Sequence, residues 1–505
     1  MRYVFSMACM FLFASLGCAK NESEQKMQQQ IDALKIQTKH LNHQIQQLSQ
    51  AQDKHRVHAN KKVHDATVTV NSLDDHPEAL EFLPAALVAE NHVVSYIAGV
   101  PVVSSPYLGA RPAFDGSDYI VNISSINRDI RLMEQRRRLY RAYNQLDYPP
   151  PNLPIVAISG KIQPLGTFGR QYFGSAQGDI TLGANELDVA AALNDKVEAY
   201  MAIAYDASPP AWSGQRIANS SFNLNMGFIN IGDLDTTPWY FTAGQIFVPF
   251  GRFSTAMVSA PLTMLTGRIK ARPFIFGYKS QGPSGPFAAI YAYSGDTTLG
   301  NSGVGGANLG YIISHGKGAG EVGVSFVSSL NSAGGLQRTG SYPGTTFGGF
   351  GSFTNGSEAV RQTPAFDIHA SVSYDNINLT AEWVGVTEAY RQQDLSFNNH
   401  GAKPQALQLE AGITFMAFNR PSSVALGYQS TSEALALNLA AQRVNGVYNI
   451  SIWKDTVESL EYRHDMDYSV KQFANGAAPN GVINQNTIGT GRAADTVLVQ
   501  IGVYF

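Results

Sequence analysis

The chain has 505 residues, which is enough for one large domain with an appendage. Its formal net charge of −3 and its pI near 6.4 reveal no dominant basic stripe, which argues against a nucleic-acid partner. Hydrophobic residues make up 44% of the chain, yet after the N-terminus no apolar run reaches the roughly 18 residues of a membrane-spanning helix. The composition therefore excludes a transmembrane helix. It leaves a transmembrane β-barrel, whose strands hide their apolar residues in alternation.

Residues 1–19 have the features of a secretory signal peptide, with the basic Arg2 ahead of a short apolar core. Cleavage after Ala19 is the simplest way of processing it. Lipidation of Cys18 is the alternative, because an imperfect lipobox precedes that residue. The other cysteine, Cys9, also lies in this leader, so the rest of the chain contains no disulfide and no thiol chemistry.

Residues 21–52 are Gln-rich and carry apolar residues at alternating spacings of four and three. This is the seam of a coiled coil, and it predicts a homo-oligomer. The alternative is a single amphipathic helix that lies on the rest of the protein. The seam consists of Met27, Ile31, Leu34, Thr38, Leu41, Ile45 and Leu48.

Residues 53–154 are mixed in composition and predict a short periplasmic extension or a partial plug. A basic helix is expected near residues 126–145, and the prolines at 149–151 end it. Residues 99–118 are loop-like and could enter a barrel lumen. The histidines of this segment lack the spacing of metal ligands, so no metal site is expected.

From residue 155 to residue 505 the pattern changes to short alternating segments separated by turns. We expect an outer-membrane β-barrel here, with lipid on the apolar face of each strand. The last strand shows the pattern most sharply, and a terminal phenylalanine on such a strand resembles the signal read by the barrel assembly machinery. The residues of this signal are Val497, Val499, Ile501, Val503 and Phe505.

The connections alternate between short turns and longer loops, as expected when all short turns face the periplasm. The short turns include Asp375-Asn376 and Asn419–Ser422, and the longer connections include residues 249–268 and 330–362. The alternation predicts sixteen antiparallel strands. This count requires Ser432–Gln442 to be an external loop rather than a strand pair.

Polar residues alternate with the lipid-facing ones, and we expect them to face the lumen. A two-residue turn at Asp375-Asn376 would place His369 opposite Glu382. Several inward carboxylates predict a mild cation preference. The lumen-facing candidates are Asp367, His369, Glu382, Glu410, Glu186, Asp188 and Glu198. No nucleophile elbow, zinc-protease motif or phosphate loop occurs, so we expect neither an enzyme nor a cofactor.

Four stretches carry a resemblance to a known family. They are Gly99–Gln145, Ile158–Ile162 (ISGKI), Phe241–Gly251 (FTAGQIFVPFG) and Asn449–Asp465 (NISIWKDTVESLEYRHD). Together they resemble the LbtU-type siderophore porins of intracellular gamma-proteobacteria, over most of the chain after the signal. The resemblance implies a sixteen-stranded barrel with a periplasmic N-terminal extension. It also implies uptake of a ferric siderophore without the TonB energy-coupling system. A general diffusion porin and a structural or adhesive envelope protein remain as alternatives.

Overall fold

The computed structural model describes most of the C-terminal three quarters of the chain. The described residues are 93–97, 100–104, 154–206, 221–234, 236–282, 284–295, 303–315, 318–338, 361–392, 394–453, 456–474 and 488–504. The predicted signal peptide, coiled coil and basic helix, together with Phe505, lie outside them. Among these residues, no helix is long and apolar enough to cross a membrane.

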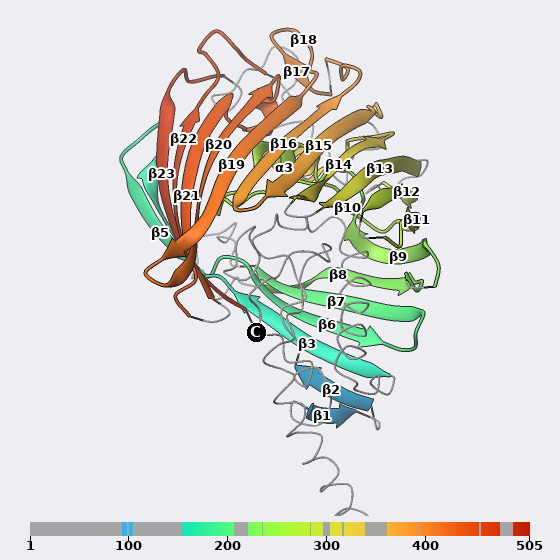
Figure 1. Cartoon of the computed structure of the whole chain (residues 1–505). Helices are drawn as coiled ribbons and strands as arrows, with labels where there is room; N and C mark the ends of the chain where they lie inside the picture. The colour runs from blue at the N-terminus through green and yellow to red at the C-terminus, as the bar shows by residue number, and fades with distance from the viewer. Residues whose placement is uncertain are drawn as a thin grey trace, which may run out of the picture. The chain divides into compact units, whose positions relative to one another are not determined.

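The described strands form a closed barrel of sixteen antiparallel strands, as the sequence predicts (Figure 1). Three of the sixteen are interrupted and carry two labels each: β3 with β4, β5 with β6, and β10 with β11. The first interruption falls at Gln163 and Pro164, where proline has no N–H to donate to a ladder. The bounds are β3 (Ile155–Ile162), β4 (Leu165–Arg170), β5 (Gln177–Thr181), β6 (Asn185–Ala192), β7 (Val197–Asp206), β8 (Ser221–Ile231), β9 (Trp239–Phe247), β10 (Lys270–Ala271), β11 (Phe274–Lys279), β12 (Gly285–Ser294), β13 (Gly303–His315), β14 (Gly318–Val327), β15 (Ala365–Tyr374), β16 (Ile377–Val386), β19 (Gln405–Ala417), β20 (Arg420–Ser432), β21 (Gln442–Ile450), β22 (Thr456–Met466) and β23 (Ala493–Tyr504).

The ring closes where the last strand meets the first. β23 pairs with β4 from Asp495↔Arg170 to Gln500↔Leu165, and it continues onto β3 at Tyr504↔Lys161. β3 extends beyond the end of β23, and there a hairpin of β1 (Val93–Ile97) and β2 (Val100–Ser104) joins the sheet. β2 pairs in parallel with β3, from Val102↔Val156 to Ser104↔Ile158. This part of the N-terminal extension therefore forms strands at the barrel seam.

The turns confirm the predicted alternation, with one correction. Asp375-Asn376 joins β15 and β16 as predicted, and His369 pairs with Glu382 across that hairpin. The turn predicted at Asn419–Ser422 instead falls at Phe418 and Asn419, with β20 beginning at Arg420. Both turn residues have positive φ, 53° and 57°, a conformation that asparagine tolerates but that is uncommon for phenylalanine. Residues 433–441 form a loop with a short 3₁₀ helix, η4 (Leu435–Leu437), and not a strand pair.

The outer face of the barrel is apolar and exposed, as the alternation predicts. On β15, the side chain of Ile368 is 57% exposed, while its neighbours Asp367 and His369 are buried. On the last strand, Val499 and Ile501 are exposed and Leu498 is buried. The outward set is therefore apolar on both strands, and the inward set of β15 is polar. The inner side is not polar throughout, since Met226 and Phe228 of β8 are buried there.

An apolar core lies at the end of the barrel that carries the long connections, and we call it the mouth core. Five connections contribute to it: those between β9 and β10, β14 and β15, β16 and β19, β20 and β21, and β22 and β23. They include the short elements α3 (Leu262–Gly267), α4 (Gly334–Arg338), β17 (Ser396–Phe397) and β18 (His400–Gly401). Mouth-core residues include Phe250, Phe253, Leu262, Leu330, Leu336, Leu395, Phe397, Ala434, Leu437, Tyr468 and Ala474.

Candidate functional site: a loop bonded to the inner wall

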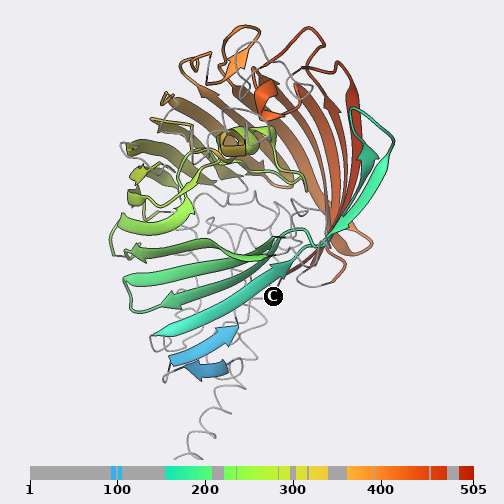
Figure 2. The ribbon, with the colours of Figure 1, turned by 180° about the vertical axis from the view of Figure 1, so that it is seen from behind.

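The connection between β9 and β10, residues 248–268, is the central feature of the lumen, and we call it the inner loop. It begins and ends at the end of the barrel with the long connections, as the alternation predicts, but its inward course is not predicted from the sequence. The loop folds back into the barrel, where α3 contacts β16, β19 and β20 (Figures 1 and 2). The side chains of Phe250 and Leu262 are fully buried in the mouth core, which stabilises this position by about 1.5–3 kcal/mol per side chain. Pro261 directly precedes α3, and its φ of −66° suits a helix start.

Three carboxylates of the barrel wall hold the backbone of the inner loop. Glu382 on β16 accepts hydrogen bonds from the N–H groups of Arg252 and Phe253, at 2.6 and 2.8 Å. Glu410 on β19 accepts from the N–H of Ala256, at 2.7 Å, and from the hydroxyl of Thr255. These carboxylates replace the strand partner that a loop lacks, because buried N–H groups need acceptors.

The third carboxylate is Glu461 on β22, which accepts from both the N–H and the hydroxyl of Ser259. Beside it, Arg443 donates to the carbonyl of Ala260 at 3.0 Å and pairs with Asp465 at 2.6 Å. Hydrogen bonds thus join the inner loop to the wall about every three residues. The wall side chains come from strands that lie far from the loop in the sequence. Hydrogen bonds to charged groups are worth about 1.5–3 kcal/mol each.

A buried charge cluster lies where the inner loop first enters the lumen. The guanidinium of Arg252 pairs with Glu321 on β14, and an oxygen of Glu321 lies 3.5 Å from Nε2 of His369. Nδ1 of His369 lies 2.7 Å from Asp367. Three carboxylates, counting Glu382, therefore share one arginine and one histidine inside the barrel. Buried charges are stable only when they are paired in this way.

Asp367, His369 and Glu382 also meet a geometric condition for binding a metal ion. Each offers one ligand atom, and these atoms lie within 4.8 Å of one another. However, the oxygens of Glu382 already accept N–H groups of the inner loop, and His369 is hydrogen-bonded to Asp367. The guanidinium of Arg252 is part of the same cluster and would repel a cation. We therefore interpret the cluster as the anchor of the inner loop and assign no metal to it.

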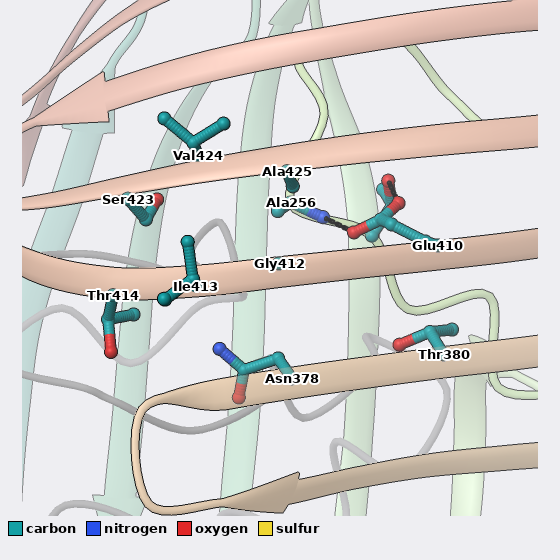
Figure 3. Close-up of a pocket in the computed structure, with 11 residues that line it drawn as sticks. Ala256, Asn378, Thr380, Glu410, Gly412, Ile413, Thr414, Ser423, Val424 and Ala425 are labelled. Atoms are coloured by element: carbon teal, nitrogen blue, oxygen red, sulfur yellow. Dashed lines mark hydrogen bonds between the residues drawn. The ribbon is translucent and has the colours of Figure 1, made fainter.

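Below the inner loop, a small hollow lined by both polar and apolar residues opens along β16, β19 and β20 (Figure 3). Asn378, Thr380, Thr414 and Ser423 line it, and Glu410 forms its boundary with the inner loop. Figure 3 shows Glu410 bonded to Ala256 rather than extended into open space. The wall of this hollow offers hydroxyl and amide groups beside the apolar side chains of Ile413, Val424 and Ala425.

The connections of the mouth core are hydrogen-bonded to one another. The hydroxyl of Tyr390 donates to the side chain of Asn331 at 3.1 Å, and the N–H of Asn398 donates to the carbonyl of Phe473 at 2.8 Å. The hydroxyl of Tyr468 accepts from the N–H of Ala434 at 3.0 Å. Burial raises the pKa of the Tyr468 hydroxyl above its usual value, so it stays protonated at neutral pH.

The structure places all seven predicted lumen residues on the inner side of their strands. Asp367, His369, Glu382 and Glu410 come together under the inner loop. The other three are buried on β6 and β7, where Glu186 and Glu198 accept hydrogen bonds from asparagines of β8. His369 pairs with Glu382 across the hairpin, as expected, but the carboxylate that contacts its ring is that of Asp367.

Five charged residues of the site lie outside the predicted set, namely Arg252, Glu321, Arg443, Glu461 and Asp465. Strand alternation could have found the two glutamates, because Glu321 and Glu461 share the inward side with Ser325 and Ser459. Arg252 carries no such signal, because it lies in a connection whose inward fold depends on tertiary contacts.

A closed ring of sixteen antiparallel strands, with an apolar outer face and a loop bonded inside, defines a porin-like β-barrel. The UPF0422 protein of Legionella pneumophila (strain Lens) is 65% identical over 447 residues, covering 88% of this chain and 84% of the relative. The UPF0422 protein of Coxiella burnetii is 33% identical over 405 residues, covering 79% and 83%. The chain therefore belongs to the UPF0422 protein family.

No family model matches the chain. Among solved structures, the outer membrane channel DcaP of Acinetobacter baumannii is similar at a TM-score of 0.43 and 14% identity, covering 70% of this chain and 97% of that one. An anion-selective porin from Comamonas acidovorans is similar at a TM-score of 0.42 and 12% identity, covering 70% and 100%. The fold assignment rests on the strand pairing itself and not on these two likenesses.

Proposed function

We propose that this protein is an outer-membrane transport protein that carries a ferric siderophore through its barrel, without the TonB system. The observation that supports this most directly is the lumen with buried carboxylates and an inner loop, inside a cylinder with an apolar outer face. A soluble barrel would cover its outer face with polar side chains, whereas here large apolar side chains are exposed on that face. A closed barrel also leaves no unpaired strand edge, which a lipid bilayer would not tolerate.

The side chains at the two ends of the outer face support a membrane position. Trp239 and Tyr374 are exposed at the short-turn end, and Tyr462 is exposed near the long-connection end. Aromatic residues of this kind sit at both membrane–water interfaces of such barrels. In this proposal the short turns and the N-terminal extension face the periplasm, and the mouth core faces the cell exterior.

The packing of the mouth core favours transport of a selected solute over free diffusion of small solutes. Its connections are joined by hydrogen bonds and packed around fully buried side chains, among them Leu330 and Leu336. A general diffusion porin needs an aqueous path of constant width, whereas a selective transporter can open such a packed mouth when its ligand binds. The siderophore itself rests on the resemblance in the sequence. Its partners in this proposal are outer-membrane lipid, the barrel assembly machinery and further copies joined by the coiled coil.

The test has two arms. Deletion of the gene should impair growth on a ferric siderophore as sole iron source, leave growth on ferrous iron unchanged, and show no dependence on a TonB homologue. Purified protein in liposomes should admit small sugars slowly or not at all. Fast sugar permeation, together with equal growth of mutant and parent on several siderophores, would make a general diffusion porin the better description. An impermeable barrel with unaffected growth would favour a structural or adhesive protein.

A further inference from the structure

We propose that the seam between the first and last barrel strands carries a binding site for the phosphate groups of an outer-leaflet lipid. The site is an exposed patch of two apolar and three basic side chains, which we call the outer patch. It consists of Arg170, Phe173, Val470, Lys471 and Arg492. The inference rests on the membrane-spanning barrel of the proposed function.

The strand register places the outer patch at the border of the apolar face. Phe168 pairs with Val497, and Val497 pairs with Tyr462, so these three form one outward-facing row across β4, β23 and β22. The next outward row toward the long-connection end changes character, from apolar to polar. There Arg170 pairs with Asp495, and Asp495 pairs with His464. This change marks the level at which a lipid headgroup replaces the acyl chain.

The remaining members of the outer patch come from the two connections next to this row. The guanidinium of Arg492 lies 5.1 Å from the ring centroid of Phe173, whose side chain is 61% exposed. Val470 is 65% exposed, and an added Cβ on Gly491 would lie 3.5 Å from it. The two connections therefore present apolar contacts and cations side by side, which matches a lipid with acyl chains and a phosphate.

The outer patch carries a net positive charge. Among the described residues, no carboxylate forms an ion pair with the side chains of Arg170, Lys471 or Arg492. Two acids lie nearby, and both already accept hydrogen bonds. Asp495 accepts from the hydroxyl of Tyr462 at 2.6 Å and lies 2.7 Å from Nδ1 of His464.

The second acid is Asp467, which accepts from the N–H and the hydroxyl of Thr490, at 2.9 and 2.7 Å. Both acids keep their charge, and Asp495 attracts Arg170, its strand partner. The three basic side chains of the outer patch therefore outnumber the two acids by one. Basic side chains near an anionic membrane surface contribute about 1 kcal/mol each to the attraction. A soluble phosphate would gain the same charge contacts, but it would gain nothing from Phe173 and Val470.

The test compares lipid binding by the full-length protein with binding by Arg170→Gln/Arg492→Gln, in detergent and by native mass spectrometry. The probe is diphosphorylated lipid A, with phosphatidylcholine as the zwitterionic reference. We expect the double variant to bind lipid A about 30-fold more weakly, which corresponds to about 2 kcal/mol. Binding of phosphatidylcholine should be unchanged. A matched control, Lys196→Gln/Arg420→Gln, removes two exposed cations from the short-turn end and should bind lipid A as the parent does.

Equal binding of lipid A by parent and patch variant would overturn the inference. So would inorganic pyrophosphate that displaces lipid A completely, because the site would then recognise a soluble anion and not a lipid. Each variant is first checked for a heat-dependent change of migration in SDS gels. A protein without this shift is no membrane barrel, and the proposed function would fail. A folded barrel without a difference in lipid A binding would contradict only the outer patch.

Discussion

Replacing Glu382 with alanine should release the first part of the inner loop from the wall. The carboxylate accepts two backbone N–H groups, from Arg252 and Phe253, and the variant leaves both donors buried without an acceptor. At about 1–3 kcal/mol for each buried donor left without an acceptor, the loss is about 2–6 kcal/mol. Relief of the repulsion between Glu382 and the buried Asp367 offsets part of it. We expect a net weakening of about 2–4 kcal/mol, a factor of roughly 30 to 1,000 in the ratio of bound to released loop.

Limited trypsin digestion measures this release directly, because the inner loop contains its own cleavage sites. In the parent, the side chain of Arg252 is only 5% exposed, so the bond that follows it is protected. The variant should be cut after Arg252 and Arg268 while the rest of the barrel stays intact, as mass spectrometry of the fragments would show. Glu388→Ala is the matched control, since it removes an exposed carboxylate that pairs with Arg361 at the surface. Cleavage of the Glu382 variant at the rate of the parent would refute the role assigned to this carboxylate.

Four further outcomes are expected. The variant Glu382→Gln/Glu410→Gln should increase current fluctuations in single-channel recordings but change ion selectivity little, and a large loss of cation preference would place both carboxylates on the ion path. Gly323→Ala should lower the unfolding temperature measured in detergent, because the added Cβ would lie 2.5 Å from Nε2 of His369 and overpacking costs about 1–3 kcal/mol. An unchanged unfolding temperature would show that the ring can move aside. The folded protein should resist SDS until boiled and then migrate differently, since the barrel is closed by hydrogen bonds; identical migration would contradict the fold. A peptide of residues 21–52 should self-associate as a helix in sedimentation and circular dichroism, and a monomeric, unfolded peptide would speak against the coiled coil.

The strands could be predicted from the sequence because their signal is local. In a barrel, each residue faces either lipid or lumen, so a period of two appears in every strand and the turns show where it restarts. The register at Asp375-Asn376 followed from a single turn, and the pairing of His369 with Glu382 was correct. The turn near Asn419 was misplaced because a phenylalanine with positive φ is not expected in a turn.

The inner loop could not be predicted, because its position depends on contacts between distant parts of the chain. The bonds from Glu382, Glu410 and Glu461 to the loop link residues that are more than 100 positions apart. No local pattern in residues 248–268 distinguishes a loop that enters the lumen from one that leaves it. Alternation indicates that the carboxylates face inward. It carries no information on the backbone N–H groups of the inner loop that donate hydrogen bonds to them.

The closure of the ring has a consequence for how the protein folds. β23 pairs with β4 and β3, so the barrel is completed only by contacts between residues more than 300 positions apart. Such contacts require the closure of a very long loop of chain, and folding slows as the mean sequence separation of contacts rises. The other fifteen strand pairs join strands that follow one another in the sequence, so they close shorter loops of chain. Until the twelve residues of β23 pair with it, the edge of β4 stays open. A chain truncated before β23 would therefore expose that edge to any other unpaired strand.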